Sequence, residues 1–101
     1  MKATKQSSNM TSFHGHSMKA TVQQLRQVLG EPAWISSNIE EKVQYDWVME
    51  TDAGQVFTVY DWKEYRHFEE DELIEWHIGS HESATSKVAM YELMNELYHL
   101  Q

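Results

Sequence analysis

The sequence predicts a single α+β domain, in which an antiparallel sheet of about four strands packs against two helices in the order β-α-β-β-β-α. Three observations lead to this fold class. Residues 42–62 alternate between apolar and polar side chains around a turn sequence, which is typical of a β-hairpin. Residues 22–29 and 82–99 carry apolar side chains at the spacing of an α-helix.

Length and composition limit the possible functions. The chain has 101 residues, of which 41% are hydrophobic and 12% aromatic, so it is long and apolar enough for one small folded domain. Sixteen acidic and eight basic side chains give a formal net charge of −8, which disfavours general binding to nucleic acid. The chain has no cysteine, which excludes disulfides and fits a reducing cytoplasm. No run of 18 apolar residues is present, and we expect no membrane span.

The first segment of the chain is polar. We expect residues 1–10 to form a flexible tail and residues 11–101 to form the domain. Residues 11–18 are a candidate first strand, although their alternation is weak and Gly15 weakens it further.

The first helix is the clearest element of the sequence. Thr21 and Gln24 have the spacing of a capping box, which favours a helix that begins at the next residue. Gly30 supplies a left-handed stop and Pro32 follows it, so the helix is predicted over residues 22–29.

A hairpin follows a loop at residues 33–41. Residues 51–54 have the composition of a turn, and the segments on either side of it are rich in β-branched and aromatic residues. The first strand of the hairpin therefore has one buried face. The residues of that predicted face are Val43, Tyr45, Trp47 and Met49.

The end of the chain is predicted as a loop, a strand and a helix. Residues 63–73 contain five acidic side chains and form an exposed loop before a fourth strand at residues 73–78. The helix at residues 82–99 has two apolar stripes, so one can cover the sheet while the other needs a second surface. In a chain this short, that surface is expected to be another copy, which predicts a homo-oligomer. The stripes are Val88, Tyr91 and Tyr98, and Met90, Leu93, Met94, Leu97 and Leu100.

One candidate binding segment is VYDWKEYR, after the turn of the hairpin. Tyr60, Trp62 and Tyr65 offer aromatic faces on which a planar base can stack. Lys63 and Arg66 lie between and beside them and can hold phosphate. The alternative is structural, with Trp62 in the core and the cations balancing nearby acidic side chains.

A second candidate is the strand-to-helix corner in the segment EWHIGSH. Trp76 and His77 precede it on the predicted strand, and Gly79, Ser80 and His81 form the corner. The start of a helix presents unpaired backbone N–H groups, which can bind an anion such as phosphate. The alternative is that a serine only caps the helix, since the glycine spacing of a P-loop is absent.

A third candidate is a metal site. His14 and His16 share one strand face, and they can approach His77 and His81 if the first and fourth strands are neighbours. The chain has no HEXXH motif and no nucleophile elbow, and Glu75 with His77 is the only evident acid–base pair. We therefore expect a protein without catalysis, metal or cofactor, and keep a small His-dependent metallo-hydrolase as an alternative.

The segments GEPAW, KVQYDWVMETDAGQVFTVYDWK and IEWHIGSH together resemble a group of small proteins encoded by tailed bacteriophages. The resemblance covers about residues 12–90, and the motif E-W-H-I-G-(G/S) is its most specific part. Ser80 stands where the pattern often has a second glycine. The resemblance implies an accessory protein that is made in the cytoplasm of the bacterial host, where many such proteins counter host defences.

These observations lead to one function and one main alternative. The protein is expected to bind and sequester a nucleotide-derived immune signal, such as a cyclic nucleotide, without catalysis. A second copy would complete the binding pocket through the last helix. The alternative is an acidic inhibitor of a host defence protein, based on the acidic residues 69–72. The predicted ligand-binding residues are Tyr60, Trp62, Lys63, Tyr65, Arg66, Trp76, His77, Gly79, Ser80 and His81.

Overall fold

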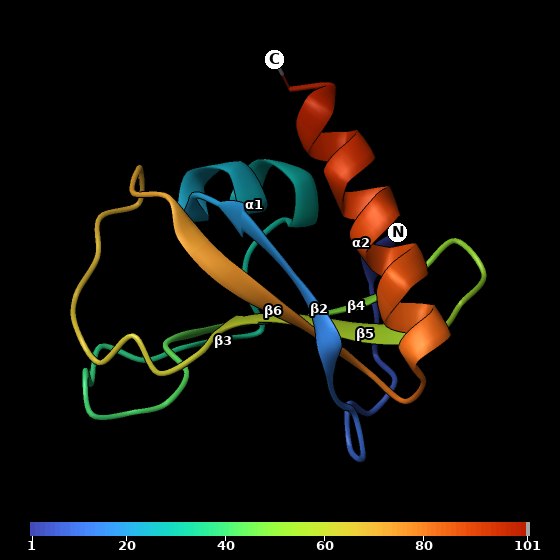
Figure 1. Cartoon of the computed structure of the whole chain (residues 1–101), viewed down its shortest axis with the longest axis horizontal. Helices are drawn as coiled ribbons and strands as arrows, with labels where there is room; N and C mark the ends of the chain where they lie inside the picture. The colour runs from blue at the N-terminus through green and yellow to red at the C-terminus, as the bar shows by residue number, and fades with distance from the viewer. Residues whose placement is uncertain (101) are drawn as a thin grey trace.

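Over residues 1–100, which are the residues that the structure describes, the computed structural model has six strands and two helices (Figure 1). All strand pairs are antiparallel, in the order β1-β4-β5-β6-β2, and β3 pairs with β4 as well. The predicted α+β class is therefore confirmed. The elements are β1 (Lys2–Ala3), β2 (Ser12–Ala20), α1 (Val22–Leu29), β3 (Trp34–Ile35), β4 (Tyr45–Glu50), β5 (Val56–Asp61), β6 (Ile74–Ser80) and α2 (Ser83–Tyr98).

The prediction of about four strands is corrected to six over the described residues. The two additional strands, β1 and β3, both pair with β4: Lys2 lies opposite Glu50, and Trp34 lies opposite Asp46. Each has only two residues, which is too short to show the alternation from which a strand is recognised in a sequence. The first ten residues, which we expected to form a flexible tail, thus supply one strand of the sheet.

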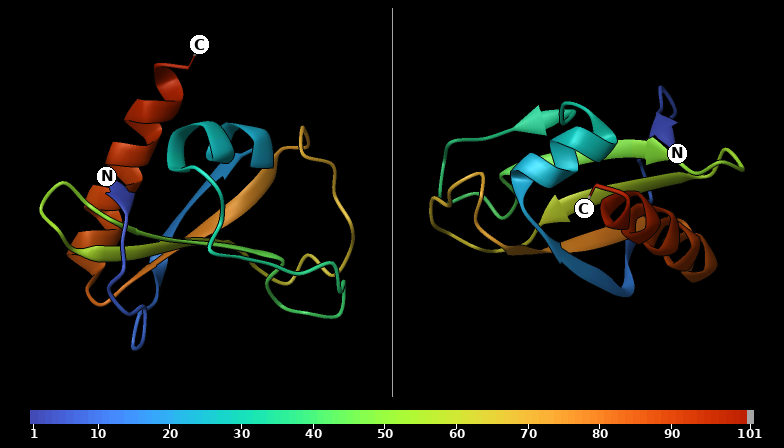
Figure 2. Two further views of the ribbon diagram at one scale, coloured as in Figure 1. Left: turned by 180° about the vertical axis from the view of Figure 1, so that it is seen from behind. Right: turned by 90° about the horizontal axis from the view of Figure 1, so that it is seen from above.

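The molecule has two layers, because both helices cover one face of the sheet and leave the other face open (Figure 2). Alternate residues of β4, β5 and β6 point toward the helices and form the core with them. The largest fully buried apolar side chains of this core are Trp47, Trp76, Phe57, Leu25, Ile78, Leu93, Val22 and Val59.

Helix α1 has the bounds that the sequence predicts. The Thr21 hydroxyl accepts a hydrogen bond from the Gln24 N–H, and the Gln24 side chain accepts one from the Thr21 N–H. Gly30 ends the helix with a positive φ of 82°, and its N–H donates to the Arg26 carbonyl. The indole of Trp47 donates to the Gly30 carbonyl at 2.8 Å, which ties the end of α1 to the sheet.

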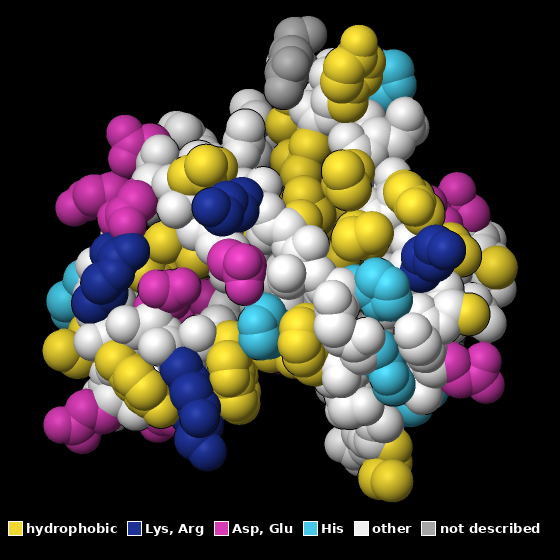
Figure 3. Space-filling model, viewed as in Figure 1, with side chains coloured by type: hydrophobic (Ala, Val, Ile, Leu, Met, Phe, Trp, Pro, Cys, Tyr) yellow, Lys and Arg dark blue, Asp and Glu magenta, His cyan; other side chains and the backbone are white. Residues whose placement is uncertain are grey.

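Helix α2 begins and ends within one residue of the predicted bounds. Ala89 and Leu93 are fully buried against the sheet, while the opposite side of the helix is exposed and apolar (Figure 3). Within residues 1–100, no helix is both long enough and apolar enough to cross a membrane. The exposed apolar side chains of α2 are Val88, Tyr91, Met94 and Tyr98.

Candidate functional site

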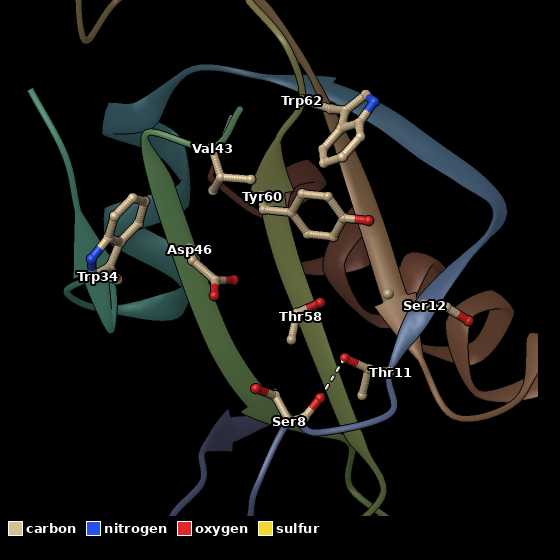
Figure 4. Close-up of a pocket in the computed structure, with 10 residues that line it drawn as sticks. Ser8, Thr11, Ser12, Trp34, Val43, Asp46, Thr58, Tyr60 and Trp62 are labelled. Carbon is tan, nitrogen blue, oxygen red and sulfur yellow. Dashed lines mark hydrogen bonds between the residues drawn. The ribbon is translucent and has the colours of Figure 1, made fainter. Parts of the chain in front are cut away.

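The open face of the sheet holds a groove of about 370 Å³, which is in the size range of small-molecule sites (Figure 4). Strands β4, β5 and β6 form its floor. The segment before β2 and the residue at the start of β3 form its sides. The lining residues are Ser8, Thr11, Ser12, Trp34, Val43, Asp46, Thr58, Tyr60, Trp62 and Gly79.

The strand periodicity puts these side chains in the groove. Phe57 and Val59 of β5 point into the core, so Thr58 and Tyr60 point to the open face. Thr58 lies opposite Gly79 of the neighbouring strand β6. The absence of a side chain at this glycine leaves room in the floor of the groove.

Asp46 is the only charged residue among those that line the groove over residues 1–100. It comes from β4 and lies between Trp34 on one side and Tyr60 on the other (Figure 4). Its Oδ1 atom is buried and has no hydrogen-bond partner. Burial, and secondly the charge of Asp61, raise the pKa of Asp46 from its ordinary value of 3.8 to about 6. A buried polar atom without a partner, in a groove, is a candidate contact for a ligand.

A second carboxylate, Asp61, anchors the corner beside the groove. Its Oδ1 accepts hydrogen bonds from the N–H groups of Gln44 and Tyr45, both at 2.8 Å. Its Oδ2 is buried without a partner, and burial raises its pKa despite these hydrogen bonds. The side chain of Gln44 in turn donates to the Arg66 carbonyl at 2.8 Å. These contacts fix the segment after β5 that carries Trp62.

Trp62 packs against a cluster of aromatic rings beside the groove. The imidazole of His77 stacks on Phe13 with 4.0 Å between ring centroids, and on Trp62 with 6.1 Å. Tyr60 meets the edge of His77 at 5.6 Å. Burial lowers the pKa of His77, which favours the neutral ring that such packing requires. His77 therefore holds Trp62 in position and does not itself line the groove.

Two lysines lie at one end of the groove. The Nζ atom of Lys63 is 5.4 Å from the centre of the Trp62 ring. The backbone N–H of Lys63 donates to the Lys42 carbonyl at 2.8 Å, so the two residues are adjacent next to the lining residues Trp62 and Val43. Lys63 has a positive φ of 54°, an uncommon conformation for a residue other than glycine. Strain of this kind is concentrated at functional sites.

The structure brings only part of the predicted binding set together. Tyr60, Trp62 and Gly79 line the groove, and Lys63 lies at its edge. Tyr65 is exposed outside the groove. The segment VYDWKEYR therefore contributes to the site, but its last residues turn away from it.

The prediction that Arg66 holds phosphate stays a prediction, because the exposed guanidinium is paired within its own loop. Its guanidinium makes two hydrogen bonds to the Glu72 carboxylate, one of them at 3.2 Å, and lies over the ring of Phe68. This pair raises the pKa of Arg66 and lowers that of Glu72. The pairing of Arg66 matches one part of the structural alternative, whereas Trp62 is exposed and not in the core.

The prediction that the corner EWHIGSH binds the ligand is wrong for its buried residues. Trp76 and Ser80 have the same parity along β6 as the core residue Ile78, so they point toward the helices and not into the groove. Trp76 is fully buried, and its indole donates to the Ala20 carbonyl. The Ser80 hydroxyl is buried and donates to the Glu82 carbonyl. His81 is exposed and lies outside the groove, so these three residues do not form the predicted ligand site.

The histidines do not support the metal site. The ring of His14 lies 3.0 Å from the Ser80 carbonyl, and that of His77 is stacked between aromatic rings. Across residues 1–100, no three His, Asp or Glu side chains are close enough together to hold a metal ion. The alternative of a metallo-hydrolase thus has no support in the geometry.

Sequence reasoning found only Tyr60, Trp62 and Gly79 among the residues that line the groove, and it missed the other lining residues as well as Lys42 beside them. Asp46 was predicted on the exposed face of its strand, and Trp34 was assigned to a loop. Thr58 and Lys42 were not singled out. No local signal marked Asp46, because an acidic residue that alternates with apolar ones is the usual pattern of an exposed strand face. The groove itself depends on the pairing of distant segments, which one sequence does not give.

The structure gives no support to the prediction that a second copy completes the pocket through α2, because α2 lies away from the groove. Ala89 and Leu93 pack on the face of the sheet opposite to Thr58 and Tyr60. The exposed side of α2 and the groove thus lie on opposite sides of the sheet within one chain. Self-association through α2 remains a prediction, separate from the site.

Replacing Gly79 by alanine is expected to destabilise the protein by about 1 to 3 kcal/mol and to weaken ligand binding. A Cβ atom at this position would lie 2.7 Å from the Thr58 hydroxyl and 3.4 Å from the Tyr60 ring. Chemical denaturation measures the stability. The double variant Gly79→Ala, Thr58→Ala removes the closer contact and should recover part of the loss, and no recovery would show that the contact is not the cause.

Comparisons with protein families, with curated proteins and with solved structures found no match to this chain.

Proposed function

We propose that the protein is a non-catalytic binding protein whose groove holds the heterocyclic base of a nucleotide-derived molecule. The observation that carries the proposal is the buried, unpartnered Oδ1 of Asp46 in a groove flanked by aromatic rings. A carboxylate oxygen accepts hydrogen bonds from the amino and imino edge of a base. The faces of Trp34 and Trp62, which are both partly exposed, can stack on its ring.

The phosphate of such a molecule would lie at the end of the groove. Lys42 and Lys63 are exposed and adjacent there, whereas the lining of the groove itself contains no basic residue over the described chain. Lys63 keeps the role that the sequence predicts for it. Two cations match one or two phosphates, so a mononucleotide or one half of a cyclic dinucleotide fits this arrangement better than a longer strand.

Isothermal titration calorimetry against nucleosides, mononucleotides and cyclic di- and trinucleotides tests the proposal. We expect binding that is weakened roughly 5- to 100-fold by Trp62→Ala or Trp34→Ala, which is the usual loss when one stacking ring is removed. Tyr98→Ala is the matched control, because Tyr98 is a 70% exposed aromatic residue on α2, away from the groove. Absence of heat from every compound at high micromolar concentration would reject the proposal.

Two wider expectations from the sequence stay separate from this proposal. The role against host defences rests on the resemblance to phage accessory proteins alone. The alternative of an acidic inhibitor has less support than the groove, because Arg26 pairs with Glu70 and Arg66 pairs with Glu72. Two of the four acidic residues at positions 69–72 therefore form ion pairs within the chain.

A further inference from the structure

The groove has an uncompensated negative charge. Its lining over residues 1–100 contains one carboxylate, Asp46, and no Lys, Arg or His side chain. Asp61 does not line the groove, since it has the same strand parity as the core residues Phe57 and Val59, but its charge still acts on Asp46. The Oδ1 atom of Asp46 has no hydrogen-bond partner. Burial and the charge of Asp61 both disfavour the ionised form of Asp46, so a cation beside Asp46 would offset part of this cost.

The aromatic rings of the groove also favour a positively charged ligand. The faces of Trp and Tyr rings are electronegative, so they attract a cation that lies over them. Asp46 lies between Trp34 and Tyr60, and Trp62 lies beyond Tyr60 at one end of the groove (Figure 4). An anion or a neutral ring would leave the charge of the carboxylate unbalanced in this site.

The net charge of the molecule also favours a cationic ligand. The chain has a formal net charge of −8, which raises the local concentration of cations and repels free anions. The lysines at the end of the groove stand apart from its floor, and one of them already lies over the outer ring, Trp62. The site therefore separates a position for positive charge from a position for phosphate.

We propose that the ring bound in the groove carries a formal positive charge, so that the ligand class is an N-alkylated pyridinium or purinium. This inference rests on the proposed function and narrows it. The ring lies between Trp34 and the Tyr60–Trp62 pair, and its charge or its N–H groups face Asp46. A phosphate attached to the ring by a sugar points toward Lys42 and Lys63.

Matched pairs of small compounds test the inference, since each pair differs by one methyl group and one charge. The pairs are 1-methylnicotinamide with nicotinamide, and 1-methyladenosine, which is a cation at pH 7.5, with adenosine. At pH 7.5 we expect the cation of each pair to bind about tenfold more tightly or better in a calorimetric titration. Asp46→Asn should remove this preference, and Tyr98→Ala should leave it unchanged.

The outcomes separate this inference from the proposed function. Equal or tighter binding of the neutral compounds overturns the charge selection and leaves the base-binding groove intact. A cation preference that persists in Asp46→Asn also overturns the inference, because it assigns the selection to another group. If no compound of either pair binds and the nucleotide panel also gives no heat, the groove is not a base site and both proposals are wrong.

Discussion

Replacing Asp46 by asparagine is expected to weaken ligand binding by roughly 30-fold or more while making the folded protein more stable at neutral pH. The binding loss follows because asparagine has nearly the same shape but no charge. The gain in stability follows because the Oδ1 atom is buried without a partner, and asparagine places no charge there. A residue that costs stability in the free protein and contributes to binding is typical of a functional site.

The sign of the stability effect follows from the pKa. Burial raises the pKa of Asp46 in the folded protein to about 6, so the folded state binds a proton more tightly than the unfolded chain. The ionised carboxylate therefore lowers the free energy of unfolding above pH 6, and this cost disappears as the pH falls toward 4. Since Asp46 is partly exposed, the gain of Asp46→Asn at pH 7.5 is expected to be about 1 to 2 kcal/mol.

Denaturation of both proteins at several pH values measures this effect. The quantity of interest is the difference in unfolding free energy between Asp46→Asn and the wild type. This difference cancels the contributions of the other carboxylates, including Glu72, whose pKa is lowered and whose effect on stability has the opposite sign. Asp61 and Tyr60, the titratable neighbours on β5, are present in both proteins. A loss of stability in Asp46→Asn at pH 7.5, or a difference that does not change with pH, contradicts the assignment of Asp46 as an unpaired buried acid.

The second large effect is expected at Trp76. Trp76→Ala should destabilise the protein by roughly 3 to 5 kcal/mol, because it removes a fully buried ring from the core. It also removes the hydrogen bond from the indole to the Ala20 carbonyl and the edge-to-face contact with Trp47, whose ring centre is 5.5 Å away. For a domain of this length, the midpoint of thermal unfolding should fall by about 15 °C or more.

Trp62→Ala is the matched control for this substitution. Trp62 is 40% exposed on the open face, so its removal should change the free energy of unfolding by less than about 1 kcal/mol while reducing binding. Thermal unfolding of the two variants separates the core role from the ligand role. A stable Trp76→Ala variant that only loses ligand binding would restore the original prediction that this ring stacks on the ligand.

The parts of the fold that follow local rules could be predicted from the sequence. The capping box of Thr21 and Gln24 defines α1, and the alternation on both sides of the turn at residues 51–54 defines the hairpin of β4 and β5. These signals depend on neighbours a few residues apart. Strands β1 and β3 depend on pairing with β4 over long distances in the chain, so no local pattern marks them.

The site was predictable only where its residues follow the same local rules. Tyr60 and Trp62 were found because aromatic and basic residues alternate in their segment. Trp76 was misassigned although its alternation with Ile74 and Ile78 already placed it on an apolar strand face. Asp46 acquires its role from burial beside Trp34, and that contact follows from the pairing of β3 with β4.

Chemical-shift mapping of the four indole N–H signals, during titration with 1-methylnicotinamide, tests the binding groove most directly. The indoles of Trp47 and Trp76 are hydrogen-bonded in the core, while Trp34 and Trp62 line the groove. We predict that the signals of Trp34 and Trp62 move with the ligand concentration and that those of Trp47 and Trp76 stay in place. Saturable binding that leaves Trp34 and Trp62 unchanged would contradict a ligand site on the open face of the sheet.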